Sequence, residues 1–200
     1  MILGFCGSPR SGATEYVIKE ALRMIEMKGH KTEFYSIKDK EIRYCIHCDY
    51  CLQKKGCIFN DDMNLLYELL KEAEGIIIGS PVYNGGITAQ TKAVLDRTRA
   101  IVAANPKVFE GKKGIAVTIG GDRNGGQELA IQQIITFYIL NGIIPLSGGF
   151  FGANIGATFW SKDTLEGVIA DEEGFKSLKK TVKRFLDYID KKSESTELSY

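Results

Sequence analysis

The chain has 200 residues, of which 44% are apolar and 26% are charged, and its formal net charge is +1. A chain of this length can bury a large core as a single domain without disulfide cross-links. No block of basic residues indicates a nucleic-acid partner, and the apolar runs are too short to span a membrane. The first residues, MILGFCGSPR, lack the pattern of a signal peptide. We therefore expect a cytoplasmic protein in a reducing compartment.

Strand-like and helix-like patterns alternate along the chain. Short apolar runs are typical of strands, and apolar residues three or four positions apart are typical of helices. In chain order the patterns predict strand Met1–Cys6, helix Glu15–Lys28, strand Thr32–Ile37, helix Met63–Ala73, strand Gly75–Gly79, helix Thr88–Ala104, strand Gly114–Ile119, helix Gln127–Leu140, strand Ile143–Phe150 and helix Asp171–Lys191. This alternation predicts an α/β fold: a flavodoxin-like five-stranded parallel sheet of order 2-1-3-4-5, with helices on both faces and a cysteine-rich loop after strand 2.

No internal repeat or low-complexity linker divides the chain, so we expect one domain over residues 1–190 and a polar tail over 191–200. Two stretches have no clear period: the cysteine-rich loop and Phe151–Ala170, which we expect to be irregular. The predicted helix Gln127–Leu140 is apolar on more than one face. The apolar stretch is Ala130–Leu140, and it must be covered either by the core or by another subunit; we favour a subunit contact.

The loop GSPRSGAT follows the first strand and leads into the first helix. In a doubly wound sheet this loop lies at the carboxyl edge of the strands, where ligands bind. Free N–H groups at a helix start favour an anion such as phosphate. Hydroxyls at Ser8, Ser11 and Thr14 and the guanidinium of Arg10 add donors. The chain contains neither GxxxxGK[ST] nor GxGxxG, which disfavours a nucleotide triphosphatase and a dinucleotide site.

Two further glycine-rich loops are expected at the same edge. SPVYNGG follows the third strand and GGDRNGGQE follows the fourth. Tyr83 offers a flat face, the Asn84–Gly86 segment is a turn, and the glycines of the second loop expose backbone amides to a flat ligand. A phosphate cradle between such loops predicts an FMN site, and the alternative is ordinary glycine-rich turns.

Four of the five cysteines have the spacing C-x2-C-x2-C-x5-C, at Cys45, Cys48, Cys51 and Cys57. Disulfides fit poorly in a reducing compartment, and structural zinc usually uses two knuckles a dozen or more residues apart. Two successive x2 steps allow a short loop to supply three corners of a [4Fe–4S] cluster, and the longer span supplies the fourth. Zinc and free thiols remain alternatives. The fifth cysteine, Cys6, lies on the first strand and is predicted to be buried and inert.

Taken together, the stretches GSPR…T, SPVYNGGITAQTKAVLDR, GGDRNGGQE and CIHCDYCLQKKGCIFNDDM resemble the archaeal-type iron–sulfur flavoproteins, within the NADPH-dependent FMN reductase and flavodoxin-like superfamily. The resemblance implies FMN and a [4Fe–4S] cluster as cofactors. It implies that the FMN phosphate contacts Ser8, Arg10, Ser11 and Thr14. For the ring and ribityl chain it implies contacts from Pro81, Val82, Tyr83, Asn84 and Gly85, and for the opposite side of the ring from Gly120, Gly121 and Asp122.

The same resemblance implies a function. Electrons would pass between a ferredoxin-like one-electron donor, the cluster and FMN, and a small molecule would be reduced. It also implies a homodimer or homotetramer in which the cluster lies close to the flavin of a neighbouring subunit. Two alternatives are an NAD(P)H-dependent FMN or quinone reductase whose cysteines bind zinc or no metal, and a non-enzymatic electron carrier or redox sensor.

Overall fold

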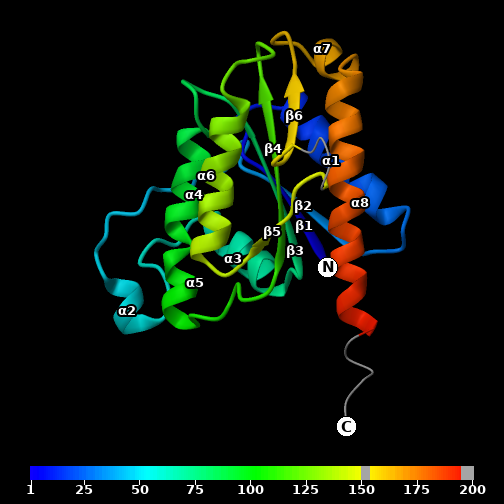
Figure 1. The fold of residues 1–200 in the computed structure, drawn as a ribbon. Coiled ribbons are helices and arrows are strands. Elements are labelled where there is room, and N and C mark those ends of the chain that lie inside the picture. The colour runs from blue at the N-terminus through cyan, green and yellow to red at the C-terminus, as the bar shows by residue number, and fades with distance from the viewer. Residues whose placement is uncertain (150–153, 195–200) are drawn as a thin grey trace.

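A computed structural model describes residues 1–149 and 154–194, and it contains a parallel sheet between two layers of helices (Figure 1). The hydrogen-bonded strand order is β2-β1-β3-β4-β5, which confirms the predicted order. A further strand, β6, also pairs with β4. The strands are β1 Ile2–Cys6, β2 Thr32–Ser36, β3 Gly75–Pro81, β4 Lys113–Gly120, β5 Ile144–Pro145 and β6 Ala157–Trp160.

Helices cover both faces of the sheet, as predicted (Figure 1). One face packs against α1 (Ala13–Glu26), α7 (Leu165–Ile169) and α8 (Glu172–Glu194). The other packs against α2 (Tyr50–Lys54), α3 (Met63–Glu72), α4 (Ala89–Arg97), α5 (Arg99–Ala104) and α6 (Gln127–Leu140). Successive residues of a strand point to opposite faces, so Ile76 and Ile78 enter one core and Ile77 enters the other. Within the described ranges no helix is both long and apolar enough to cross a bilayer.

The fifth strand position differs from the prediction. Only Ile144–Pro145 of the predicted strand Ile143–Phe150 is extended and paired, and it pairs with Lys113 and Gly114. The strand ends before two glycines, Gly148 and Gly149, the second at φ 131°, where the chain leaves the sheet. Phe150 lies outside the described residues.

The segment Phe151–Ala170, expected to be irregular, contains β6 and α7 instead. β6 pairs with the second half of β4, Val117–Gly120, so two short segments share the fifth position of the sheet. Alternate burial along ATFW is the strand signal that the sequence analysis missed.

Two helices also differ from their predicted bounds. The predicted helix Thr88–Ala104 is interrupted at Thr98, whose Oγ1 donates to the carbonyl of Leu95 at 2.7 Å. The final helix continues to Glu194, three residues past the predicted start of the tail, and residues 195–200 are outside the described chain. The interruption at Thr98 is important for the cysteine segment described below.

Candidate functional site

Buried hydroxyl groups join the first loop to the second. The N–H of Gly7 donates to the carbonyl of Gly79 at 2.7 Å, and the carbonyl of Gly7 accepts from Thr88 Oγ1 at 2.8 Å and Thr91 Oγ1 at 3.2 Å. Ser80 Oγ accepts from the N–H of Thr88 at 3.1 Å, and Ser80, Thr88 and Thr91 are fully buried. A Cβ on residue 7 would overlap Thr91 Oγ1, so only glycine allows this approach.

The second loop forms the turn that its sequence predicts. Asn84 and Gly85 have positive φ angles of 49° and 77°. Tyr83 and Gly86 exchange backbone hydrogen bonds of 2.9 and 3.1 Å across them. This is the geometry of a two-residue hairpin, for which Asn-Gly is strongly preferred. The Tyr83 side chain is 44% exposed, which leaves its ring available to a ligand.

The third loop approaches the second closely. A Cβ built on Gly126, whose φ is 94°, would lie 3.0 Å from the Cα of Gly85. The N–H of Val82 also donates to the carbonyl of Ile119 at 2.9 Å. Gln127 closes the loop, because its Nε2 donates to the carbonyl of Asp122 at 2.6 Å. The three loops therefore meet at the carboxyl edge of β1, β3 and β4, as expected.

The first loop has the features of a phosphate site. Ser8 and Thr14 are buried, and Arg10 and Ser11 are exposed. Ser8 Oγ donates to the carbonyl of Arg10 at 2.7 Å, so this hydroxyl shapes the loop. The helix α1 starts at Ala13 and no side chain caps its first turn. Its first N–H groups thus lie at the same edge as the two glycine-rich loops and are suited to an anion.

A fourth loop, after β6, reaches this edge and was not predicted. Ser161 donates to the carbonyl of Gly120 from its N–H at 2.9 Å and from its Oγ at 3.1 Å. A Cβ on Gly121 would lie 2.5 Å from the carboxylate of Asp163. The loop therefore buttresses Gly120 and Gly121. It was missed because its segment was expected to be irregular.

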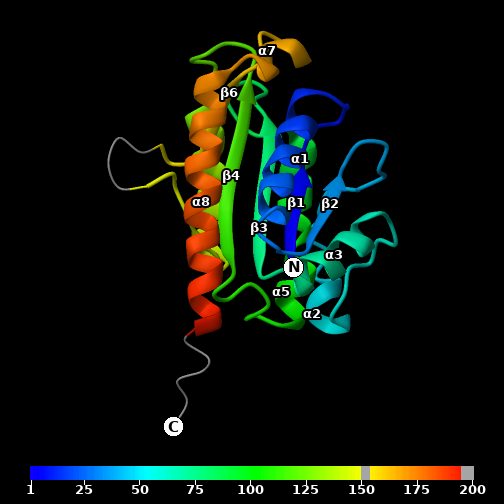
Figure 2. The ribbon, with the colours of Figure 1, turned by 90° about the vertical axis from the view of Figure 1, so that its right-hand side faces the viewer.

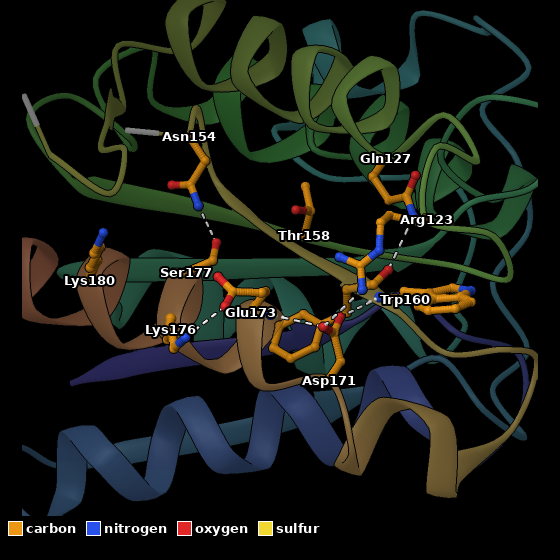
Figure 3. A pocket seen from close by; sticks show the side chains of 12 residues that line it. Arg123, Gln127, Asn154, Thr158, Trp160, Asp171, Glu173, Lys176, Ser177 and Lys180 are labelled. Carbon is orange, nitrogen blue, oxygen red and sulfur yellow. Dashed lines mark hydrogen bonds and ion pairs between the residues drawn. The ribbon is translucent and has the colours of Figure 1, made fainter. Parts of the chain in front are cut away.

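A polar cavity of about 270 Å³ lies between α6 and α8, beside the third loop (Figure 3). Arg123 lies over the ring of Trp160 at 4.9 Å and is 3.9 Å from the carboxylate of Asp171. Asp171 accepts from the N–H of Trp160 at 2.7 Å and from the N–H of Gly174 at 3.2 Å. These contacts attach β6 to the first turn of α8 and so support the outer side of the third loop.

All four cysteines of the motif line one small pocket. His47 and Asp49 have positive φ angles of 53° and 58°, and these two left-handed residues turn the chain just before α2. Cys51 is 8% exposed and belongs to the core, whereas Cys48 is exposed. The bend between α4 and α5 places Arg97 and Arg99 on the wall of this pocket, and neither arginine was singled out by the sequence analysis.

Arg97 joins the two ends of the cysteine segment. Its side chain is 1% exposed and donates to both carboxylate oxygens of Asp61, at 2.9 and 3.0 Å, and to the carbonyl of Arg43 at 2.6 Å. Burial alone raises the pKa of Asp61, but hydrogen bonds from Arg97 and from backbone amides outweigh it and hold this pKa below its ordinary value. The chain is thus fixed just before Cys45 and just after Cys57.

The four thiols converge on one pocket, as the ligands of a shared metal centre must. Thiolates are the ligands of iron–sulfur clusters, which take one cysteine at each iron of a [4Fe–4S] cluster. The donor set of four cysteines therefore fits such a cluster.

The two sites lie apart within one chain. Figure 2 shows the carboxyl ends of β3 and β4 at the top and α2 and α5 near the opposite end. The structure therefore brings the three loops together and the four cysteines together, but it does not bring the two groups to each other.

The remaining thiol, Cys6, is fully buried on β1. Burial raises its pKa to about 11, so at neutral pH it is a protonated, unreactive thiol. The prediction that Cys6 is buried is confirmed.

Fold and sites together define a class: a flavodoxin-like redox protein that uses a flavin. Residues 1–157 match the family model of NADPH-dependent FMN reductase. The chain is 63% identical over 191 residues to an iron–sulfur flavoprotein of Archaeoglobus fulgidus, covering 96% of this chain and 98% of that protein. It is 50% identical over 193 residues to an iron–sulfur flavoprotein of Methanocaldococcus jannaschii, covering 96% and 98%. The chain belongs to the NADPH-dependent FMN reductase family and, within it, to the iron–sulfur flavoproteins; it is an FMN-dependent oxidoreductase.

Among solved structures the fold is similar to that of RosB with its bound intermediate 8-demethyl-8-formylriboflavin-5'-phosphate. The TM-score is 0.73 at 17% identity, covering all of this chain and 81% of that chain. At this identity the likeness confirms the fold.

Proposed function

We propose that this protein holds FMN at the three loops and a [4Fe–4S] cluster on Cys45, Cys48, Cys51 and Cys57, and that it moves electrons from a ferredoxin-like donor to a small acceptor. The observation that carries the proposal is the shared pocket of four cysteines, fixed at both ends by a buried arginine, in a chain whose flavin loops also converge. The names of the relatives and the family support both cofactors. A reducing, cytoplasmic location fits four thiols that must stay free to bind iron.

At the flavin site the chain supplies binding and orientation. Ser8, Arg10, Ser11, Thr14 and the start of α1 hold the phosphate. The second loop provides Pro81, Val82, Tyr83, Asn84 and Gly85 to the ring and ribityl chain, and the third provides Gly120, Gly121 and Asp122. When bound, the cluster supplies one-electron steps and FMN accepts one or two electrons. No acid or base is assigned, because a flavin carries out this chemistry itself.

We further propose that residues 1–190 act as one domain within a homodimer or homotetramer, in which electrons cross between subunits. Electron transfer slows steeply with distance, and the two sites lie apart within one chain (Figure 2). Four exposed apolar side chains surround the cysteines, and we call them the apolar collar: Tyr44, Ile46, Leu52 and Ile58, which are 51–73% exposed. A second copy that covers the collar removes this apolar area from water and brings its own flavin near the cluster.

A second candidate is an NAD(P)H-dependent FMN or quinone reductase, which the name of the matching family favours. Turnover under argon with reduced ferredoxin against NADPH separates the two. Faster turnover with ferredoxin supports the proposal, and turnover with NADPH alone favours the second candidate. If neither donor supports turnover of any acceptor, the protein is an electron carrier or redox sensor.

The test of the cluster is anaerobic purification followed by iron, sulfide and visible-spectrum analysis. We expect about four irons and four sulfides per chain. Cys48→Ala should remove the iron and leave FMN bound, because the thiol lies far from the flavin loops. Cys6→Ala is the matched control and should keep both the iron and the FMN. A yellow wild-type protein without iron would falsify the proposal.

A further inference from the structure

Arg99 contacts one of the four cysteines directly. Its Nη1 lies 3.4 Å from Cys51 Sγ, within hydrogen-bonding range for sulfur, and its Nη2 donates to Asp49 Oδ1 at 2.6 Å. In this structure Cys51 is a free thiol, and its Sγ stands in for the thiolate that would bind iron. One guanidinium therefore bridges a predicted cluster ligand and a fixed carboxylate.

The backbone explains why this arginine points at Cys51. Arg99 is the first residue of α5, just after the interruption at Thr98, and α5 packs against α2, which carries Cys51. Asp49 precedes α2 in a left-handed conformation, and its carboxylate accepts a hydrogen bond from Nη2 of the guanidinium. The ion pair is partly exposed, 32% for Arg99 and 47% for Asp49, so its role is orientation rather than stability.

We propose that Arg99 is a positioning residue that raises the reduction potential of the cluster, an inference that rests on the proposed function. One-electron reduction adds one negative charge to the cluster and its thiolates, and no bond forms or breaks. A charged N–H donor on a thiolate sulfur stabilises that added charge. The potential of a cluster depends on hydrogen bonds to its sulfurs and on nearby charge. Asp49 offsets part of the charge of Arg99, so the main contribution of Arg99 is its hydrogen bond to the sulfur.

Two other cations lie on the same segment and provide a comparison. Lys54 and Lys55 are exposed, at the end of α2 and just after it. They add positive charge near the cysteines, but water screens an exposed charge strongly. A fixed donor on the sulfur should therefore have a larger effect on the potential than either lysine.

The test is redox titration of the iron-loaded protein, followed by EPR. In Arg99→Met the ratio of reduced to oxidised cluster at a fixed applied potential should fall about tenfold, a shift of ~59 mV to more negative potential. Lys55→Met removes a similar charge without a sulfur contact and should shift the ratio much less. Arg99→Lys keeps the positive charge but loses the planar guanidinium that contacts both Cys51 and Asp49, and it should give an intermediate shift.

Pulsed EPR in heavy water provides a readout that a structural role would not affect. The wild-type protein should show an exchangeable deuteron coupled to the reduced cluster that is absent in Arg99→Met. If Arg99→Met loses iron, the same measurement is made on Arg99→Lys. Two results would overturn the inference. One is the same potential in the iron-loaded wild-type protein and the Arg99 variants, and the other is a shift in Lys55→Met as large as that in Arg99→Met. A wild-type protein without iron would instead refute the proposed function.

Discussion

Arg97 is the residue on which the shape of the cysteine segment most depends. It is buried, and it is paired to a carboxylate that lies 36 positions away in the chain. Arg43 also stacks on the ring of Phe59 at 4.2 Å, which adds a second contact between the two ends of the segment. A buried ion pair is not by itself a source of stability, but the loss of one partner leaves the other charge uncompensated.

We therefore expect Arg97→Met to lower the free energy of unfolding by about 3–5 kcal/mol and to reduce the iron content. The double variant Arg97→Met with Asp61→Asn should recover part of the stability, because no buried charge is left alone. Arg23→Met, which breaks an exposed pair with Glu20, is the control and should change stability by less than about 1 kcal/mol. Urea unfolding and iron analysis measure both effects. Wild-type iron content in Arg97→Met would show that the cysteine segment does not depend on this residue.

At the scale of elements, the proposed flavin site depends on loops that contact one another across three strands. The hydroxyl cluster of Ser80, Thr88 and Thr91 joins the first two loops, and the approach of Gly126 to Gly85 joins the second to the third. Each contact needs a residue without a Cβ at one position. The strands thus position the loops, and glycines allow the loops to approach one another closely enough to stay in contact.

Gly126→Ala tests the second of these contacts. A non-glycine residue at positive φ costs about 1–2 kcal/mol, and at this position the added Cβ would also push against Gly85. Gly111→Ala is the matched control, because Gly111 has φ 74° but open space around its Cβ position. We expect both variants to lose stability and only Gly126→Ala to bind FMN more weakly, as measured by flavin fluorescence titration. Equal FMN affinity in the two variants would mean that this contact does not shape the site.

For the whole molecule, exposed apolar side chains gather around α2 and on α6, within one layer of helices. The apolar collar lies around the cysteines, and Leu129, Ile139 and Leu140 of α6 are 57–79% exposed while Ile131, Ile134 and Tyr138 face the core. That α6 is a subunit contact stays a prediction, and its exposed apolar residues are consistent with it. The opposite layer, α1 and α8, contains no cysteine of the motif.

We expect Leu52→Glu together with Ile58→Glu to shift the protein to a smaller assembly in light scattering, because charge in the collar opposes burial by a second copy. Reduction of FMN by ferredoxin should slow in parallel, and the iron content should not change. Met27→Glu is the control: Met27 is 72% exposed at the end of α1, on the other layer. An unchanged assembly with fast FMN reduction would place the electron path elsewhere.

The sequence by itself determined the features that depend on near neighbours in the chain. Alternating strand and helix periods indicated the parallel sheet, the segment Asn84–Gly86 indicated a turn, and the cysteine spacing indicated a shared site for four thiols. Only the tertiary structure decided that β5 and β6 share one position of the sheet, that Arg97 closes the cysteine segment and that Arg99 faces Cys51. It also placed the cysteines away from the three loops of the proposed flavin site. These features depend on contacts between residues tens of positions apart, and local periodicity contains no information about which distant partner a side chain meets.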